Sequence, residues 1–222
     1  MNNEPNLLDS YKHKGLRKRL TDVVRRKGIR DNRILNAIEK VPRHFFLDSA
    51  FHELAYEDQA MQIGEGQTIS QPYTVAYQTE VLEIESGDKV LEIGLGSGYQ
   101  ACILIELGAE VYSIERIASL CEKAKILLPA MGYHPHMFIG DGTLGLPDHA
   151  PFDKIIVTAA APDVPSALVD QLKCGGIMVI PIGNMETQVM YKITKTSEKT
   201  FSKTALDAFR FVPLIGKQGW RG

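Results

Sequence analysis

Three glycines at alternate positions, Gly94, Gly96 and Gly98, interrupt an apolar run and could form a ligand-binding turn. Residues 90–100 read VLEIGLGSGYQ, an apolar strand pattern before the glycines and an apolar helix pattern after them. Glycine has no Cβ, so the backbone can turn tightly there, and the N–H groups at the start of the following helix would face the ligand. We therefore expect a nucleotide-type cofactor at this turn.

The spacing of the glycines separates different kinds of nucleotide-binding turn. A dinucleotide fingerprint has its third glycine one position later, where this chain has Tyr99, and no lysine–serine pair is present to form a P-loop. Taken alone, a glycine-rich turn of this kind could also bind nothing.

Acidic residues at the ends of later strand patterns point to one class of cofactor. Glu115 ends the run VYSIE, about twenty residues after the turn, where a carboxylate can accept hydrogen bonds from both hydroxyls of a ribose. Asp141 and Gly142 follow the next strand pattern, where the carboxylate could meet an adenine amino group, although such residues also form simple turns. With Glu92 ahead of the glycines, this order is that of enzymes that use S-adenosylmethionine.

The segment TAAAP at 158–162 bears on which group would receive a methyl. Its small side chains supply neither a polar acceptor nor the aromatic ring that holds a flipped base in enzymes that methylate amino groups of bases. His134 and His136 are near neighbours around Pro135, with no third ligand in view, so we expect no metal site.

The bulk composition excludes some classes of protein. A chain of 222 residues suits one good-sized α/β unit, and a formal net charge of −2 with a pI near 6.3 argues against a general nucleic-acid binder. Basic residues crowd positions 12–30, but apolar residues run through them at helical spacing, which predicts the solvated face of a docking helix.

The cysteines and the apolar segments predict the cellular location and the oligomeric state of the protein. Cys102, Cys121 and Cys174 lie far apart in apolar or helical contexts, which predicts reduced core residues. No apolar run approaches the roughly eighteen residues of a membrane span, and the polar start has no signal-peptide core. We expect a cytoplasmic protein without a membrane partner, and a monomer, because no long apolar stripe is left exposed.

The elements that must position these residues follow from periodicity. We expect helices at 16–26 and 31–41, the second capped by Asp31 and ended by Pro42, then a loop with a short strand pair at 55–71 and a helix from Pro72 to before Gly87. The rest predicts strands at 89–93, 110–114, 135–139, 152–157 and 176–181, helices at 98–107, 117–131 and 164–171, and two final strands at 189–194 and 205–212 around a turn at 197–199.

This order of elements indicates an α/β fold with a doubly wound, mostly parallel sheet. N-terminal helices precede the sheet, and an antiparallel hairpin extends one edge. We expect a single unit over 1–222, in which 1–86 forms the helical and substrate-loop part, 87–183 the cofactor-binding core, and 184–222 the hairpin and tail. In such sheets ligands bind beyond the carboxyl ends of the strands, where the glycine turn, Glu115 and Asp141 would gather.

Seven segments, in order along nearly the whole chain, match one known family. They are VPRHFF (41–46), AYEDQAMQIGEGQTISQPYTVA (55–76), VLEIGLGSGYQAC (90–102), VYSIER (111–116), GDGTLGLPDHAPFDKIIVTAAAP (140–162), LKCGGIMVIPIG (172–183) and RFVPLIG (210–216). The chain thereby resembles the protein-L-isoaspartate O-methyltransferases, with QTISQP as the most specific match and Leu95, where the family more often has threonine, as a departure.

The resemblance implies a Rossmann-like methyltransferase fold and a protein-repair activity. The enzyme would move a methyl group from S-adenosylmethionine, leaving S-adenosylhomocysteine, to the free carboxylate of L-isoaspartyl residues in damaged proteins and peptides. Such a carboxylate has a pKa near 4 and needs no general base, so positioning is the main task. The resemblance makes Ser70 the acceptor-side residue, which would donate a hydrogen bond to the carboxylate. The expected cofactor-binding residues are Gln71, Glu92, Gly94, Gly96, Gly98, Glu115, Asp141 and Gly142.

Several alternatives remain open at this point. Ser70 could be a helix N-cap, although Pro72 at the first helical position would make Gln71 the cap residue. The stretch RFVPL could pair with the main chain of a peptide, or Phe211 and Val212 could simply finish the edge hairpin. Gly64 and Gly66 could let their loop close over the substrate. Other functions to weigh are methylation of another carboxylate, hydroxyl or small molecule, a non-catalytic adaptor, and a nicotinamide oxidoreductase.

Overall fold

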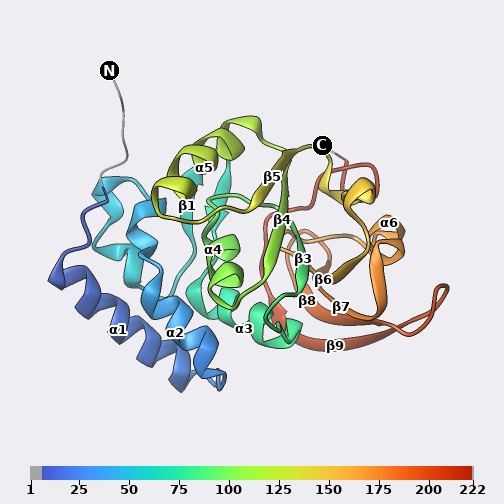
Figure 1. The fold of residues 1–222 in the computed structure, drawn as a ribbon, viewed down its shortest axis with the longest axis horizontal. Coiled ribbons are helices and arrows are strands. Elements are labelled where there is room, and N and C mark those ends of the chain that lie inside the picture. The colour runs from blue at the N-terminus through green and yellow to red at the C-terminus, as the bar shows by residue number, and fades with distance from the viewer. Residues whose placement is uncertain (1–6, 222) are drawn as a thin grey trace.

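The central feature of the fold is a seven-stranded sheet with the strand order β5-β4-β3-β6-β7-β8-β9. The structure is a computed structural model that describes residues 7–221 (Figure 1). The strands are β3 (Lys89–Ile93), β4 (Glu110–Glu115), β5 (His136–Ile139), β6 (Phe152–Val157), β7 (Leu172–Gly183), β8 (Gln188–Lys195) and β9 (Phe201–Phe209). Strands β3 to β7 pair in parallel, and β8 and β9 extend the edge as an antiparallel hairpin. The predicted fold class is confirmed.

Helices cover both faces of this sheet. One face packs against α3 (Pro72–Leu82), α4 (Tyr99–Glu106) and α5 (Ala118–Ala130), with α1 (Tyr11–Arg26) and α2 (Asn32–Lys40) as an outer layer (Figure 1). The other face carries the short α6 (Ser166–Asp170) and the 3₁₀ turns η4 (Gly142–Leu144) and η5 (Pro147–His149). Strand β3 shows why both faces are buried: Val90 joins one apolar cluster while Leu91 and Ile93 join the other.

The segment between α2 and α3 folds into short pieces that lead to the pocket. It contains the 3₁₀ turns η1 (Arg43–Phe46), η2 (Ser49–Phe51) and η3 (Leu54–Tyr56), then the predicted strand pair, β1 (Met61–Gly64) and β2 (Gln67–Ile69). The tip of this hairpin has three successive residues in the left-handed region, Gly64, Glu65 and Gly66, with φ of 91°, 55° and 67°. Such a tip suits two glycines and costs the glutamate some strain.

Helices α2 and α3 have the predicted N-cap residues, and Asp58 supplies an additional capping contact at α3. Asp31 caps α2 by accepting a hydrogen bond from the N–H of Arg33 at 2.8 Å, as predicted. At α3 the N-cap residue is Gln71, whose side chain does not cap the helix. The carboxylate of Asp58 accepts instead, from the N–H of Tyr73 at 2.8 Å and from Nε2 of Gln71 at 3.0 Å. Asp58 therefore fastens the preceding loop to the start of α3.

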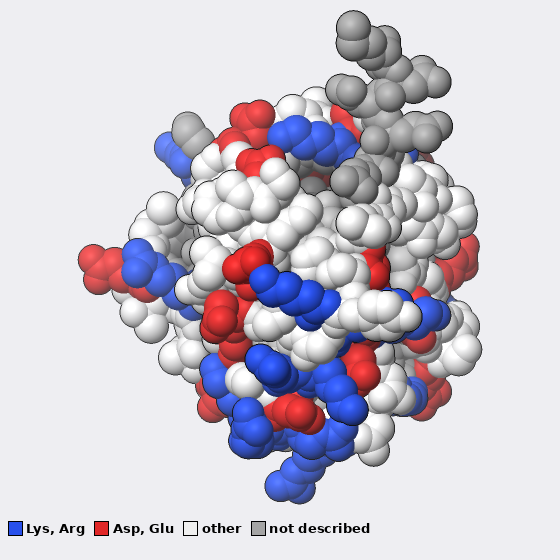
Figure 2. Space-filling view, turned by 90° about the vertical axis from the view of Figure 1, so that its left-hand side faces the viewer, with Lys and Arg blue, Asp and Glu red and all other residues white. Residues whose placement is uncertain are grey.

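The basic N-terminal region is mostly a solvated helix face, with one exception. Figure 2 shows Lys and Arg side chains gathered in the lower part of this side of the molecule, with Asp and Glu between them. The exposed members include Lys14, Lys18, Arg19, Arg25, Arg26 and Arg30. Arg17 differs: it is 5% exposed, its guanidinium pairs with both carboxylate oxygens of Asp9, and it contacts the hydroxyl of Tyr56. Arg17 is therefore part of the packing between α1 and the η3 region.

Two further expectations need correction. Cys102 and Cys121 are buried free thiols as predicted, but Cys174 is exposed, because it lies in an irregular part of β7 beside Gly175 and Gly176 rather than in the core. The last strand runs over 201–209 instead of 205–212. Its first residue, Phe201, is exposed, and the three that follow are polar and exposed on the sheet edge, so no apolar alternation marks where it starts.

Within the described part of the chain, no helix has the length and apolar character needed to cross a membrane.

Candidate active site

Two adjoining hollows lie beyond the carboxyl ends of β3, β4 and β6. The first, the inner pocket, is lined by the glycine turn, the residues after β4, the segment before α3 and the chain after β9. Its residues are 67–70, Val75, 93–97, Tyr99, Gln100, 114–117, Gly142, Thr158, Ala159 and 212–215. The second, the outer cleft, is lined by Ala60, Gln62, Thr68, 70–71, Tyr73, Thr74, Thr158, Met185 and 208–213. The two share Thr68, Ser70, Thr158, Val212 and Pro213.

The glycine turn needs glycine at all three positions. Gly94, Gly96 and Gly98 have φ of 93°, 53° and 87°. A Cβ on Gly94 would lie 2.5 Å from Oγ1 of Thr158, and one on Gly98 would lie 2.7 Å from Cδ1 of Leu128. Gly94 and Gly96 line the inner pocket, and the spacing seen in the sequence therefore has a steric cause.

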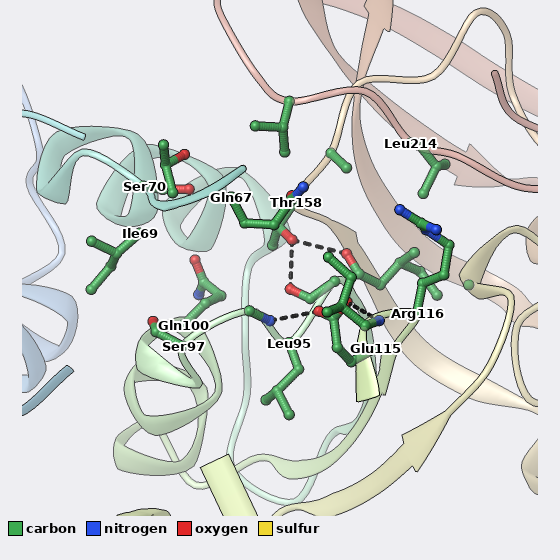
Figure 3. Close-up of a pocket in the computed structure, with 18 of the residues that line it drawn as sticks. Gln67, Ile69, Ser70, Leu95, Ser97, Gln100, Glu115, Arg116, Thr158 and Leu214 are labelled. Carbon is green, nitrogen blue, oxygen red and sulfur yellow. Dashed lines mark hydrogen bonds between the residues drawn. The ribbon is translucent and has the colours of Figure 1, made fainter. Parts of the chain in front are cut away.

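Glu115 lies on the floor of the inner pocket and holds the turn from below. Its Oε2 accepts from the N–H of Gly96 at 2.8 Å, and its Oε1 accepts from the N–H of Ile117 at 2.8 Å (Figure 3). The residue is only 7% exposed. A carboxylate has about four acceptor positions, so each oxygen can still accept a hydrogen bond from a ligand.

Thr158 joins the end of β6 to the glycine turn. Its Oγ1 lies 2.9 Å from the carbonyl oxygen of Ile93 and 2.7 Å from that of Gly94, and its N–H donates to Ile93 at 3.0 Å (Figure 3). From the sequence, this position is notable only for its small side chain. Its hydroxyl fixes the wall that the two hollows share, a role that has no sequence signature beyond a threonine after a buried strand.

Gln100 was also missed: it lines the inner pocket, and its side chain holds a buried acceptor atom. Its Nε2 donates to Oγ1 of Thr79 at 3.0 Å, whereas its Oε1 is buried and has no hydrogen-bond partner. Unpaired buried acceptors are uncommon and raise the question of what would pair with them.

Ser70 lies on the segment between β2 and α3, where the inner pocket meets the outer cleft (Figure 3). It is one residue outside the cap position, which Gln71 occupies, and Asp58 supplies the capping carboxylate. Among the hydrogen bonds of residues 7–221, none uses the Ser70 hydroxyl. The N-cap interpretation is therefore wrong, and the hydroxyl is available to a ligand.

Four of the expected cofactor-binding residues lie outside the lining of the inner pocket: Gly98, which packs against Leu128, and three residues with polar side chains. Gln71 lines the outer cleft, and its amide is held by Asp58. Glu92 points to the opposite side of β3, where burial raises the pKa of its carboxyl to about 8. It accepts from the hydroxyl of Ser113, and its other oxygen has no partner. Glu92 is therefore a buried core residue and not part of the inner pocket lining.

Asp141 is the third residue, and its carboxylate is engaged in the protein. It accepts from the N–H and hydroxyl of Thr143 at 3.0 and 2.7 Å and from the N–H of Lys217 at 2.8 Å. Partial burial would raise its pKa, but these hydrogen bonds prevail and hold the pKa below its ordinary value. Asp141 thus anchors the C-terminal segment, and its neighbour Gly142 lines the inner pocket instead.

The stretch after β9 pairs with the segment after β6. The N–H of Ala160 donates to the carbonyl of Val212 at 2.8 Å, and the N–H of Leu214 donates back to Ala160 at 2.8 Å. The N–H of Phe211 donates to Oε1 of Gln188 at 2.8 Å. Phe211 and Val212 therefore do not finish the edge hairpin. Val212 lines both hollows, and Phe211 lines the outer cleft.

Aromatic side chains form the far wall of the outer cleft. The rings of Tyr73 and Phe209 stack with centroids 6.5 Å apart, and Phe209 contacts Phe211 at 6.3 Å. The exposed Arg210 and Met185 stand beside them. This wall is apolar with a single positive charge, and it suits an extended peptide better than a second nucleotide.

One cluster has potential metal ligands, at a distance from these hollows. Ligand atoms of Asp9, His13 and His44 lie within 4.8 Å of one another. Asp9 is already paired with Arg17, and both ring nitrogens of His44 have partners, the Tyr56 hydroxyl at 2.6 Å and the Leu8 carbonyl at 3.2 Å. Asp9 and His44 are therefore hydrogen-bonded parts of the packing, whereas Nδ1 of His13 is buried without a partner.

The comparisons with known proteins agree with one another. A family model described as Protein-L-isoaspartate(D-aspartate) O-methyltransferase (PCMT) matches residues 15–219. The Protein-L-isoaspartate O-methyltransferase of Cytophaga hutchinsonii is 55% identical over 212 residues, which cover 96% of each chain. That of Dictyoglomus thermophilum is 51% identical over 212 residues, covering 95% of each.

Solved structures extend this similarity to the fold. One protein-L-isoaspartate O-methyltransferase has a TM-score of 0.82 and 31% identity, covering 91% of this chain and 67% of that one. Another, from Plasmodium falciparum and in complex with S-adenosyl-L-homocysteine, has a TM-score of 0.75 and 28% identity, covering 90% and 98%. The similarity therefore spans both hollows.

Proposed function

The chain belongs to the protein-L-isoaspartate(D-aspartate) O-methyltransferase family, and we propose that its inner pocket holds the methyl donor while its outer cleft holds the damaged peptide. The enzyme transfers a methyl group from S-adenosylmethionine to the free carboxylate of L-isoaspartyl residues, which starts their conversion to normal aspartate. The observation that carries the assignment of the two hollows is their shared wall of Thr68, Ser70, Thr158, Val212 and Pro213.

The residues of the inner pocket fit the donor. The glycine turn lets a ligand approach the backbone, and the carboxylate of Glu115 keeps free acceptor positions for ribose hydroxyls. Gly142 and Leu214 line the side at which an adenine would lie. When bound, S-adenosylmethionine supplies an electrophilic methyl group on a positively charged sulfur.

The acceptor side needs no general base. An isoaspartyl carboxylate is ionised at neutral pH, so its oxygen is already nucleophilic. Ser70 would donate a hydrogen bond to this carboxylate and hold one oxygen toward the inner pocket. The segment 67–70 and the stretch 212–215 enclose the junction, which keeps water away from the reacting atoms. Orientation of two opposite charges at roughly 3–3.5 Å is then the main catalytic contribution.

The later steps follow from the chemistry of the ester. The methyl ester is a better leaving group than the carboxylate, so the next backbone nitrogen of the peptide displaces methanol and closes a succinimide. Hydrolysis of that ring gives some normal aspartate. No protein group is required for either step.

The peptide would lie along the outer cleft in an extended form. An isoaspartyl site has no fixed neighbours, so recognition through main-chain contacts along 210–213 is better suited to it than a set of side-chain pockets. In this proposal the three parts of the chain have separate tasks. Residues 1–86 bring the Ser70 loop, 87–183 bind the donor, and 184–222 supply the other wall of the cleft.

We also propose that the enzyme works as a monomer in the cytosol. One chain supplies the residues that line both hollows, and its three cysteines are free, as expected in a reducing compartment. Light scattering on the purified protein tests the first point, and a stable dimer would overturn it.

Methyl transfer to an isoaspartyl peptide, measured beside its normal aspartyl twin, tests the function. Equal transfer to both peptides, or transfer only to small molecules, would point to a different carboxylate methyltransferase.

A further inference from the structure

We infer that Gln100 is a donor-binding residue whose side-chain Oε1 accepts a hydrogen bond from the ammonium group of the methyl donor. This inference rests on the proposed function of the inner pocket. It concerns a residue that the glycine motif does not predict, since Gln100 lies in the first turn of α4, after the glycines.

The orientation of the Gln100 amide follows from its neighbours. The hydroxyl of Thr79 donates to the carbonyl oxygen of Val75 at 2.7 Å, so its oxygen is left to accept. Nε2 of Gln100 donates to that oxygen at 3.0 Å. Turning the amide over would set Oε1 of Gln100 against Val75 in competition for a single hydroxyl proton, and one hydrogen bond would be lost.

The acceptor atom that remains is buried and unpaired. Gln100 is 7% exposed and lines the inner pocket, yet its Oε1 has no partner. Leaving such an acceptor unpaired is unfavourable, so a ligand that supplies an N–H or O–H group there is favoured.

The position of Gln100 indicates which group of the methyl donor would give its Oε1 a hydrogen bond. In Figure 3, Gln100 lies with Ser97 near the Ser70 side, whereas Glu115 and Arg116 lie on the other side of the pocket. Glu115 is placed to meet the ribose, so the adenosine part extends toward its side. The amino-acid part is left for the Gln100 side, and its ammonium is the hydrogen-bond donor of that part.

Calorimetric binding of S-adenosylhomocysteine and two analogues tests this, with no need for turnover. One analogue carries hydrogen in place of the amino group, and the other lacks the carboxylate. Gln100→Leu keeps the approximate size of the side chain and removes its polar atoms. We expect Gln100→Leu to weaken the binding of S-adenosylhomocysteine by about tenfold or more, and the binding of the decarboxylated analogue by a similar factor. The dissociation constant of the deaminated analogue should differ between wild type and variant by less than about threefold.

Controls separate the possible causes. Gln67→Leu makes the same change at another lining residue, on β2, and should show no preference for ligands that carry the amino group. Melting of the ligand-free variants checks that they fold. If Gln100→Leu weakens all three ligands equally, or weakens the deaminated analogue while sparing the decarboxylated one, the ammonium assignment is wrong. If wild type fails to bind S-adenosylhomocysteine at all, the proposed function itself fails.

Discussion

The carboxylate of Glu115 and the backbone N–H of Gly96 are joined by a hydrogen bond of 2.8 Å. The same carboxylate accepts from Ile117 through its other oxygen. One side chain therefore fixes the backbone on two sides of the inner pocket and still faces the ligand. These two hydrogen bonds hold the wall of the inner pocket in place, which reduces the ordering cost of ligand binding.

Glu115→Gln tests this double role. An amide has one oxygen, so one of the two N–H groups would face an NH₂ group and lose its acceptor. We expect S-adenosylhomocysteine to bind about ten- to a hundredfold more weakly, in keeping with about 1–3 kcal/mol for a lost buried hydrogen bond. Glu110→Gln, at the exposed start of the same strand, is the matched control for calorimetry. Wild-type affinity in Glu115→Gln would show that the carboxylate does not shape the site.

Gly98→Ala tests the steric requirement of the turn. The new Cβ would lie 2.7 Å from Cδ1 of the fully buried Leu128, at a φ of 87°. Gly132→Ala is the control, since φ is 84° there and nothing lies within 4 Å. We expect the control to lose about 1–2 kcal/mol of unfolding free energy from backbone strain alone. Gly98→Ala should lose more and also bind S-adenosylhomocysteine poorly. Equal losses in urea unfolding would mean that the contact with Leu128 is unimportant.

Ser70→Ala should separate acceptor binding from donor binding. Removing a hydrogen bond to a charged carboxylate lowers kcat/KM for an isoaspartyl peptide by about tenfold or more. Affinity for S-adenosylhomocysteine should change little, because Ser70 lies at the junction with the outer cleft. Ser202→Ala, at an exposed position of β9, should leave both quantities unchanged. Parallel loss of peptide turnover and donor affinity would instead indicate a collapsed loop.

His44 predicts how stability depends on pH. Burial lowers the pKa of its imidazole to about 4, and the neighbouring His13 and His52 oppose protonation further. Between pH 6.5 and 4 the unfolded chain therefore binds more protons at His44 than the folded chain does. The contribution of His44 to the free energy of unfolding is complete above pH 6.5 and is lost as the pH falls toward 4.

Urea unfolding at pH 7 and pH 5 measures this contribution. Burial raises the pKa of Glu92 to about 8, and this carboxyl acts in the opposite direction over the same pH range, so the His44 contribution is read as a difference between variants. We expect the stability of wild type relative to His44→Gln to fall by about 2 kcal/mol from pH 7 to pH 5. His136→Gln, whose ring is half exposed, should keep the pH dependence of wild type. An unchanged slope in His44→Gln would assign the pH dependence to another group.

The regular elements could be predicted well because the sheet is buried on both faces. Runs such as VLEI and KIIV mark β3 and β6 to within a residue or two, and the glycines mark the turn. Strand β9 was placed too late, because an exposed edge strand carries no apolar alternation and Phe211 leaves the hairpin to bond with Gln188. A local sequence pattern cannot show that the backbone of Phe211 bonds to the side chain of Gln188 and does not continue the strand pairing.

The site was harder to predict than the fold, because side-chain direction depends on contacts between distant segments. Gly94, Gly96 and Glu115 line the inner pocket as expected, whereas Gly98 packs against Leu128. Asp141 is held by Thr143 and Lys217, and the Lys217 contact spans 76 residues. Gln100 and Thr158 act through hydrogen bonds to other elements that no spacing reveals. A motif can thus place the pocket without giving all of its polar contacts.

A paired peptide assay tests the central claim most directly. Two synthetic peptides that differ only in having L-isoaspartate or normal L-aspartate at one position are incubated with the enzyme and S-adenosylmethionine, and mass spectrometry follows the gain of one methyl group. We predict that the isoaspartyl peptide becomes methylated and then loses methanol to form the succinimide, while its aspartyl twin stays unchanged. Absence of any mass gain on the isoaspartyl peptide, or equal methylation of both peptides, would contradict the account.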